Sequence, residues 1–239
     1  MKNKIVLISL FALPIVIYLI FSTASHNSLF LPTLSENNSE IPQNWTGLDS
    51  SKIALSGKIT VLGFVGNNVI ENRGNFFNLN QKIYNKYKGF TDFQMVMVTP
   101  KGNEAKAKQI INELAPITGD MNGWKFVFAS PDEIQSFYDS YKLAGKLDEN
   151  YGTPAVIIVD KALNHRGRKG KNKKGLEEYK ESYNTISAAD LHNEMTDDVK
   201  IILREYRLAL KKNNNKRKDA FRDKIEENVT KANQDNNEK

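Results

Sequence analysis

Apolar and polar positions alternate along the middle of the chain in blocks that predict an α/β fold. Short, almost uniformly apolar runs are typical of strands that are covered on both faces of a sheet, and they lie at residues 58–65, 92–100, 124–130 and 154–160. Between these runs, apolar residues recur every three or four positions, the period of an α-helix. The predicted helices span residues 75–88, 103–116 and 131–142. Strands that alternate with helices in this way predict a mainly parallel sheet flanked by helices.

Single residues predict where two of these helices begin or end. Pro131 stands in the first turn of its helix and follows Ser130, a favourable N-cap residue. Pro116 predicts the end of the preceding helix, because proline lacks the N–H that continues the hydrogen-bond ladder.

The clearest amphipathic helix lies near the C-terminus, over residues 187–213. One face is apolar at steps of three or four residues, formed by Leu191, Met195, Val199, Ile202, Tyr206 and Leu210. Ser187 can cap its start, with Asp190 three residues on, close to a capping box. We predict that this helix closes the domain.

The N-terminal segment predicts export from the cytoplasm. Two lysines precede an uncharged run over residues 5–21, which spans about 26 Å as a helix. This length favours an uncleaved transmembrane anchor over residues 1–24. A cleaved signal peptide is the alternative, because residues 22–24 resemble a small-residue cleavage site. The lysines predict a cytoplasmic N-terminus and a domain on the exported side, which is periplasmic in a bacterium.

Composition divides the rest of the chain into three parts. Residues 25–50 are rich in Asn, Ser and Pro and predict a spacer. Residues 51–212 hold the α/β pattern. Residues 213–239 are highly charged with almost no apolar stripe, which predicts a frayed helix or a disordered tail.

The chain of 239 residues contains no cysteine. Disulfides, thiolate metal sites, CxxC redox chemistry and cysteine nucleophiles are therefore excluded. The sequence also lacks the G-x-S-x-G, P-loop, H-E-x-x-H and G-x-G-x-x-G motifs. We expect no cofactor and no thiol oxidoreductase activity, and the composition favours a binding protein over an enzyme.

The net charge of +6 arises largely from one segment, residues 161–174, which has seven Lys and Arg and no acid. It is either a solvated loop or a contact for anionic lipid headgroups, an acidic partner or a polyanion. The contact residues would be Arg166, Arg168, Lys169, Lys171, Lys173 and Lys174. No nucleic-acid-binding motif accompanies them, so no nucleic-acid partner is expected.

Several stretches resemble the thioredoxin-like superfamily: LSGKITVLGFVG, VMVTP and GTPAVIIVD. Together with the N-terminal anchor and the closing stretch LHNEMTDDVKIILREY, they make the chain most similar to the Sco/SenC group of membrane-anchored copper-delivery proteins. The resemblance covers about residues 40–212. It implies a thioredoxin-like fold and a role near respiratory-complex assembly.

The resemblance also implies a copper site whose ligands are missing here. That family uses two cysteines in a CxxxC loop after the first core strand and a histidine just before the last strand. Alignment places the cysteine positions at Asn67 and Glu71 and the histidine position at Gly152. We therefore expect a degenerate site without copper or another metal, in which loop 66–72 caps the following helix. The superfamily often has a cis-proline near this place; Pro154 occupies it, and the sequence leaves its isomer open.

These observations together predict a membrane-anchored, exported thioredoxin-like protein without thiol or copper chemistry. It would act as a binding or accessory factor for an unknown protein partner. The alternative is an electrostatic binder of an anionic membrane surface or a polyanion through residues 161–174.

Overall fold

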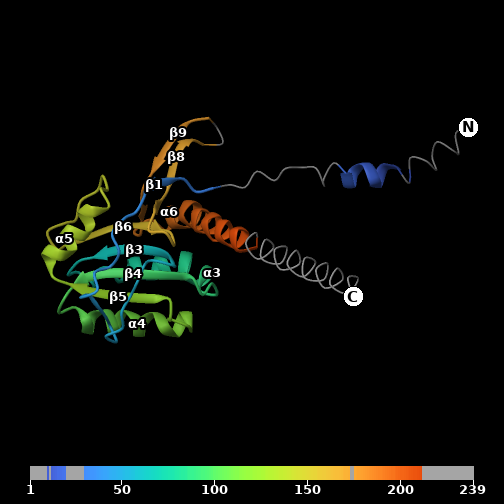
Figure 1. Ribbon diagram of the computed structural model, residues 1–239. Helices are drawn as coiled ribbons and strands as arrows, with labels where there is room; N and C mark the ends of the chain where they lie inside the picture. Colours follow the sequence, from blue (N-terminus) through green and yellow to red (C-terminus); the bar gives the residue numbers. More distant parts are fainter. Residues whose placement is uncertain (1–9, 11, 20–29, 173–174, 212–239) are drawn as a thin grey trace, which may run out of the picture.

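Three parallel strands form the centre of the sheet (Figure 1). They are β3 (Ile59–Val65), β4 (Phe93–Pro100) and β5 (Trp124–Ala129), and nearly all of their residues are buried. The structure is a computed structural model that describes residues 10, 12–19, 30–172 and 175–211. The predicted apolar runs are thus strands covered on both faces, as their composition indicated.

The fourth core strand, β6 (Gly152–Val159), pairs with β3 in the antiparallel direction. The sheet is therefore mixed, which corrects the expectation of a mainly parallel sheet. Antiparallel pairing arises because the chain enters β6 beside the end of β3, where Gly152 pairs with Val65. A uniformly apolar run predicts burial but not direction, since a strand of either direction can be covered on both faces.

Short strands complete the sheet in the order β1-β7-β6-β3-β4-β5-β2, and β10 (Tyr183–Asn184) also pairs with β6. One edge pairs β1 (Thr33–Ser35) with β7 (His165–Arg166), and at the other edge β2 (Thr46–Gly47) pairs with β5. Residues of the predicted spacer 25–50 therefore belong to the folded domain. Three apolar side chains of this segment are also buried: Leu31, Ile41 and Trp45. Strands of two or three residues are too short to give a periodic signal.

Two apolar layers cover the sheet. On one face, α2 (Arg73–Leu79), α4 (Glu104–Thr118) and the C-terminal helix pack in one cluster. On the other face, α5 (Pro131–Ser140) packs together with residues 41–55. This arrangement places the loop between β3 and α2 at the same end of the sheet as the start of β6.

The helices follow the predicted pattern with local differences. The helix predicted over 75–88 continues from α2 through a π-helical turn, η1 (Asn80–Tyr84), into α3 (Asn85–Tyr87). Helix α4 extends beyond Pro116 to Thr118 and ends at Gly119, whose φ is +77°. Proline in the last turn removes one hydrogen bond without ending the helix there.

Helix α5 begins at the predicted cap, and the capping box is complete. Ser130 Oγ accepts a hydrogen bond from the Glu133 N–H, and the Glu133 carboxylate accepts one from the Ser130 N–H at 2.9 Å. The hydrogen bonds that the Ser130 N–H and hydroxyl donate to this carboxylate lower the pKa of Glu133 to about 2. The reciprocal bonds satisfy two donors that a helix start leaves without intrahelical partners.

The C-terminal amphipathic helix runs from α6 (Ala188–Asp190) through a π-helical turn, η2 (Leu191–Met195), and over residues 196–211. Ser187 Oγ accepts from the Asp190 N–H, as predicted. The first part of the predicted apolar face is fully buried, at Leu191, Met195, Val199 and Ile202. Leu210 is exposed, because the helix has passed the edge of the sheet by that point.

The predicted anchor and tail fall mostly outside the described residues. Of residues 1–24, the structure describes residue 10 and residues 12–19, and residues 12–19 are helical. Among the helices that are described, none has the length and apolar character needed to cross a membrane. The predicted tail, residues 213–239, lies outside the described part of the chain.

Candidate functional site

The loop that follows β3 lies directly against the turn that precedes β6. The Asn67 N–H donates to the Asn150 carbonyl at 2.9 Å, and Val65 pairs with Gly152. A Cβ atom added at Gly66 would lie 2.4 Å from the Asn150 oxygen, and one added at Gly152 would lie 2.7 Å from the Val65 oxygen. The two segments meet backbone to backbone, so neither glycine position has room for a side chain.

The polar groups of this loop already have partners. Thr99 Oγ1 donates to the Gly66 carbonyl at 2.8 Å. Asn103 Nδ2 donates to Asn67 Oδ1, and Lys106 Nζ donates to the Asn67 carbonyl, both at 3.1 Å. These bonds tie the loop to the end of β4 and the start of α4. Asn67 therefore acts as an internal tie and does not project toward a ligand.

The expectation that the loop caps the following helix is wrong for its side chains. Asn72 precedes α2 but makes no side-chain cap bond. The loop is closed by backbone bonds instead: the Asn72 N–H donates to the Asn68 carbonyl, and the Arg73 N–H donates to the Ile70 carbonyl. Glu71 is exposed and has no ion pair among the described residues.

The three positions aligned with the family's copper ligands carry neither a thiol nor an imidazole. Asn67 and Gly152 lie in the two segments that touch, and Glu71 points into solvent. In the described part of the chain, no three His, Cys, Asp or Glu side chains gather in a way that could hold a metal ion. The loop therefore carries no thiol, and its one carboxylate, Glu71, is exposed.

Pro154 lies beside this contact and is exposed. Every peptide bond of the described residues is trans, including the Thr153–Pro154 bond, which answers the question left open by the sequence. The Pro154 carbonyl accepts from both the N–H and the hydroxyl of Thr185. A mainly apolar pocket of about 20 Å³ lies next to it, between β6 and α2. That volume suits about one water molecule.

Comparison with known structures places this geometry in a known fold. A SCO1/SenC family lipoprotein from Bacillus anthracis str. Ames matches with a TM-score of 0.53 at 17% identity, over 73% of this chain and 99% of that one. BsSco, a member of the Sco family of cytochrome c oxidase assembly proteins, matches with a TM-score of 0.51 at 14% identity, over 72% and 98%. The chain has the Sco fold. No protein-family model matches its sequence, and no curated protein matches it.

The basic segment of this Sco-like domain is not a single solvated loop. Arg166 lies in β7 and is only 8% exposed. Its guanidinium donates to Asp160 at 2.9 Å, to Glu205 at 2.7 Å and to the Leu31 carbonyl at 2.9 Å. The prediction that Arg166 contacts an external anion is therefore wrong, because two carboxylates of the domain itself occupy it.

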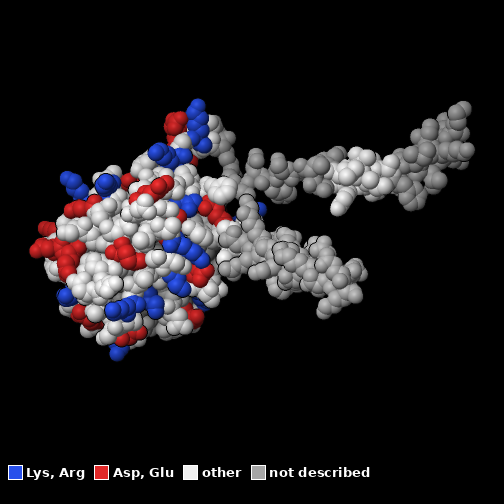
Figure 2. All heavy atoms as spheres, viewed as in Figure 1, with Lys and Arg blue, Asp and Glu red and all other residues white. Residues whose placement is uncertain are grey.

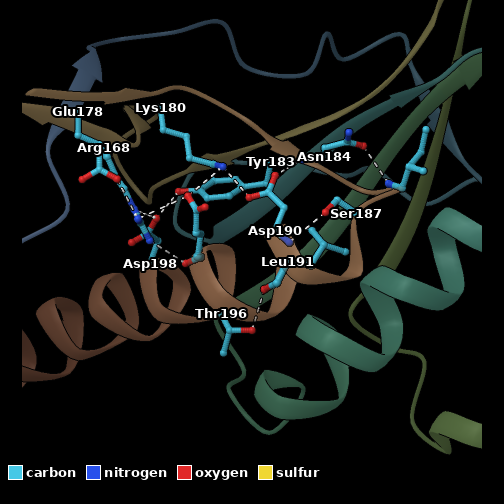
Figure 3. A network of polar contacts seen from close by, with 12 residues as sticks. Arg168, Glu178, Lys180, Tyr183, Asn184, Ser187, Asp190, Leu191, Thr196 and Asp198 are labelled. Carbon is cyan, nitrogen blue, oxygen red and sulfur yellow. Dashed lines mark hydrogen bonds and ion pairs between the residues drawn. The ribbon is translucent and has the colours of Figure 1, made fainter. Parts of the chain in front are cut away.

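Arg168 is also held internally, in the hairpin formed by β8 (Arg168–Lys171) and β9 (Glu177–Lys180) (Figure 3). Its guanidinium contacts Asp198 at 2.7 Å, Glu178 at 3.0 Å and Glu194 at 3.5 Å. The Tyr183 hydroxyl also donates to Asp198, at 2.6 Å. Burial raises the pKa of Asp198, while the bonds from Arg168 and Tyr183 oppose that shift.

Of the predicted anionic-partner contacts, Lys169 and Lys171 are exposed, whereas Lys173 and Lys174 lie outside the described residues. The acids that neutralise the two arginines all lie outside the basic segment 161–174 and were not predicted from it. One of them left a readable signal: Asp198 is three residues after Met195 and four before Ile202, on the apolar face of the C-terminal helix. A carboxylate in that position predicts a buried charge that needs a cationic partner.

Proposed function

We propose that this protein is a membrane-anchored, exported binding protein whose Sco-like domain performs neither thiol nor copper chemistry. One observation carries the proposal: of the three positions aligned with the family's ligands, Asn67 is bonded to Asn103, Glu71 is exposed, and Gly152 has no side chain. The absence of cysteine excludes thiolate chemistry independently. The anchor is proposed from the two N-terminal lysines and the uncharged run over residues 5–21.

We place the partner-binding face around the small pocket next to Pro154. Asn72, Thr153 and Thr185 line this pocket together, and Glu71, Pro154 and Ile186 are their neighbours in the chain. Ile186 is 64% exposed. Asn78 of α2 donates to the Thr185 carbonyl at 3.0 Å, which holds the segment carrying Ile186 in place. An exposed isoleucine on a fixed backbone suits a protein partner. Likeness to cytochrome c oxidase assembly proteins supports an accessory role in respiratory-complex assembly.

The first test is copper(I) binding by the full chain in competition with a chromogenic chelator. We expect no stoichiometric site, because the loop carries no soft ligand. The double variant Asn67→Cys/Glu71→Cys is the positive control, since it adds two thiolates and should take copper from the chelator. One copper bound tightly per wild-type chain would refute the proposal.

The partner-binding face is tested by a photo-crosslinking residue placed at Glu71 in the full chain, in membranes of the native cells. We expect one defined adduct, and its loss when Ile186→Asp is added, because a charge at Ile186 opposes apolar contact. The matched control places the crosslinker at Ile117 of α4, which is 56% exposed. Equal adducts from both positions, or none from Glu71, would contradict this face.

The alternative function, electrostatic binding through residues 161–174, is supported by fewer residues than predicted. Arg166, Arg168 and Lys161 are paired internally, Lys161 with Asp92, which leaves Lys169 and Lys171 among the described residues. Both lie on the hairpin, and their surroundings favour one class of anionic partner over the others.

A further inference from the structure

The β8–β9 hairpin presents cationic and apolar side chains on its outward face. Across the ladder, Lys169 pairs with Tyr179 and Lys171 pairs with Glu177, and all four are exposed. Tyr179 is 63% exposed, and Leu176 at the turn is 62% exposed. Neither lysine forms an ion pair with another described residue. The hairpin projects from the domain (Figure 1), and basic side chains lie at its end with acidic ones beside them (Figure 2).

The inward face of the hairpin holds it firmly on the C-terminal helix (Figure 3). Besides the bonds of Arg168, the Lys180 ammonium contacts Asp190 at 2.5 Å and Glu194 at 3.0 Å. A two-stranded hairpin alone is marginally stable in water. These ion pairs therefore fix a projection that keeps a leucine and a tyrosine exposed to solvent, where a partner can contact them.

The base of the hairpin lies where the chain comes in from its N-terminal apolar run. β8 follows β7, which pairs with β1, and the Gly167 N–H donates to the Pro32 carbonyl at 3.0 Å. The Leu31 N–H donates to Glu205, and the Leu31 carbonyl accepts from Arg166. About ten residues separate Leu31 from the run over 5–21, and they span at most about 35 Å. An anchor in that run would keep the hairpin close to the membrane.

We propose that the β8–β9 hairpin docks on the anionic lipid headgroups of the membrane, an inference that rests on the anchor in the proposed function. Lys169 and Lys171 bind headgroup phosphates, while Leu176 and Tyr179 enter the interface, where tyrosine is favoured. Glu177 is the one acid on this outward face and weakens the contribution of Lys171. Exposed leucine and tyrosine favour a lipid surface over a soluble polyanion, which offers no apolar phase.

The absence of native cysteine allows a direct test. Leu176→Cys in the full chain is labelled with a polarity-sensitive fluorophore, and the chain is reconstituted into vesicles. In vesicles with about 30% phosphatidylglycerol, an anionic lipid, we expect a blue-shifted emission and quenching by brominated lipids. In vesicles of pure phosphatidylcholine we expect little change. Adding Lys169→Gln and Lys171→Gln should reduce the shift by at least about half. A label at Ile117→Cys, on α4 at the opposite end of the domain (Figure 1), should not respond.

Every other outcome of this experiment contradicts a different part of the proposal. If the chain floats with the vesicles but the label at Leu176 does not respond, the docking is wrong and the anchor stands. If the chain does not float with vesicles, the anchor fails, and this inference fails with it. An equal response in pure phosphatidylcholine removes the role of the lysines. A response to heparin alone, without vesicles, assigns the hairpin to polyanions and overturns lipid docking.

Discussion

Replacing Gly66 by alanine is expected to lower the free energy of unfolding by about 3 kcal/mol. Gly66 has a φ of +68°, a conformation that costs a non-glycine residue about 1 kcal/mol. The added Cβ would also lie 2.4 Å from the Asn150 oxygen, and relieving such an overlap costs a further ~1–3 kcal/mol. Urea unfolding of the full chain, followed by circular dichroism, measures the loss.

Gly57 provides the matched control for this variant. Its φ is +78°, and nothing lies within 4 Å of an added Cβ. Gly57→Ala should therefore cost only the conformational part, about 1 kcal/mol. If both variants lose the same free energy, the close contact between the loop and the turn before β6 does not contribute to stability.

Replacing Arg166 by methionine is expected to destabilise the domain by about 3–5 kcal/mol. The substitution keeps most of the side-chain volume but removes the positive charge between Asp160 and Glu205, whose side chains are 2% and 11% exposed. Two buried carboxylates would then lack their cation, and the Leu31 carbonyl would lose its donor. Urea unfolding at neutral pH measures the effect.

The control for Arg166→Met is Arg204→Met, on the same helix as Glu205. Arg204 is exposed and has no ion pair within the described chain, so its replacement should change the unfolding free energy by less than about 0.5 kcal/mol. A loss below about 1 kcal/mol for Arg166→Met would mean that the two carboxylates are solvated or protonated without it. The hydrogen bonds that join Leu31 to Arg166 and Glu205 would then be unimportant for stability.

These two predictions also describe how the domain is assembled. Contact between the backbones at Gly66 and Gly152 closes the end of the sheet where the resembling family carries its ligands. Arg166 and Glu205 close the opposite edge, where they join the first residues of the domain to its last helix. Changes at Gly66 and Arg166 therefore test the two ends independently, and their effects should add because the sites share no partner.

Local sequence signals predicted much of this fold correctly. The capping box at Ser130 and Glu133 and the apolar face of the C-terminal helix depend on residues three or four positions apart, which a sequence displays directly. The positions of the core strands follow from uniform apolar runs. The Sco resemblance, stated from a few short stretches, agrees with the fold of the matching structures.

Other features depend on residues that are distant in the chain. Arg168 and Asp198 are 30 residues apart, and Arg166 and Glu205 are 39 apart. A run of seven basic residues without an acid therefore looked like a free surface, although two of its arginines are neutralised by acids from other elements. The net charge of a segment does not show which acidic residues from distant parts of the chain will contact it after folding.

The sequence by itself determined that this protein has no thiol chemistry, because no fold can supply a missing cysteine. It also determined where the core strands and helices lie, because their periods and caps are local. Only the tertiary structure decided the direction of β6, the inclusion of β1 and β2, the internal pairing of Arg166 and Arg168, and the backbone contact at Gly66 and Gly152. Each of these depends on how the chain returns to itself, and no local pattern identifies the partner that folding brings.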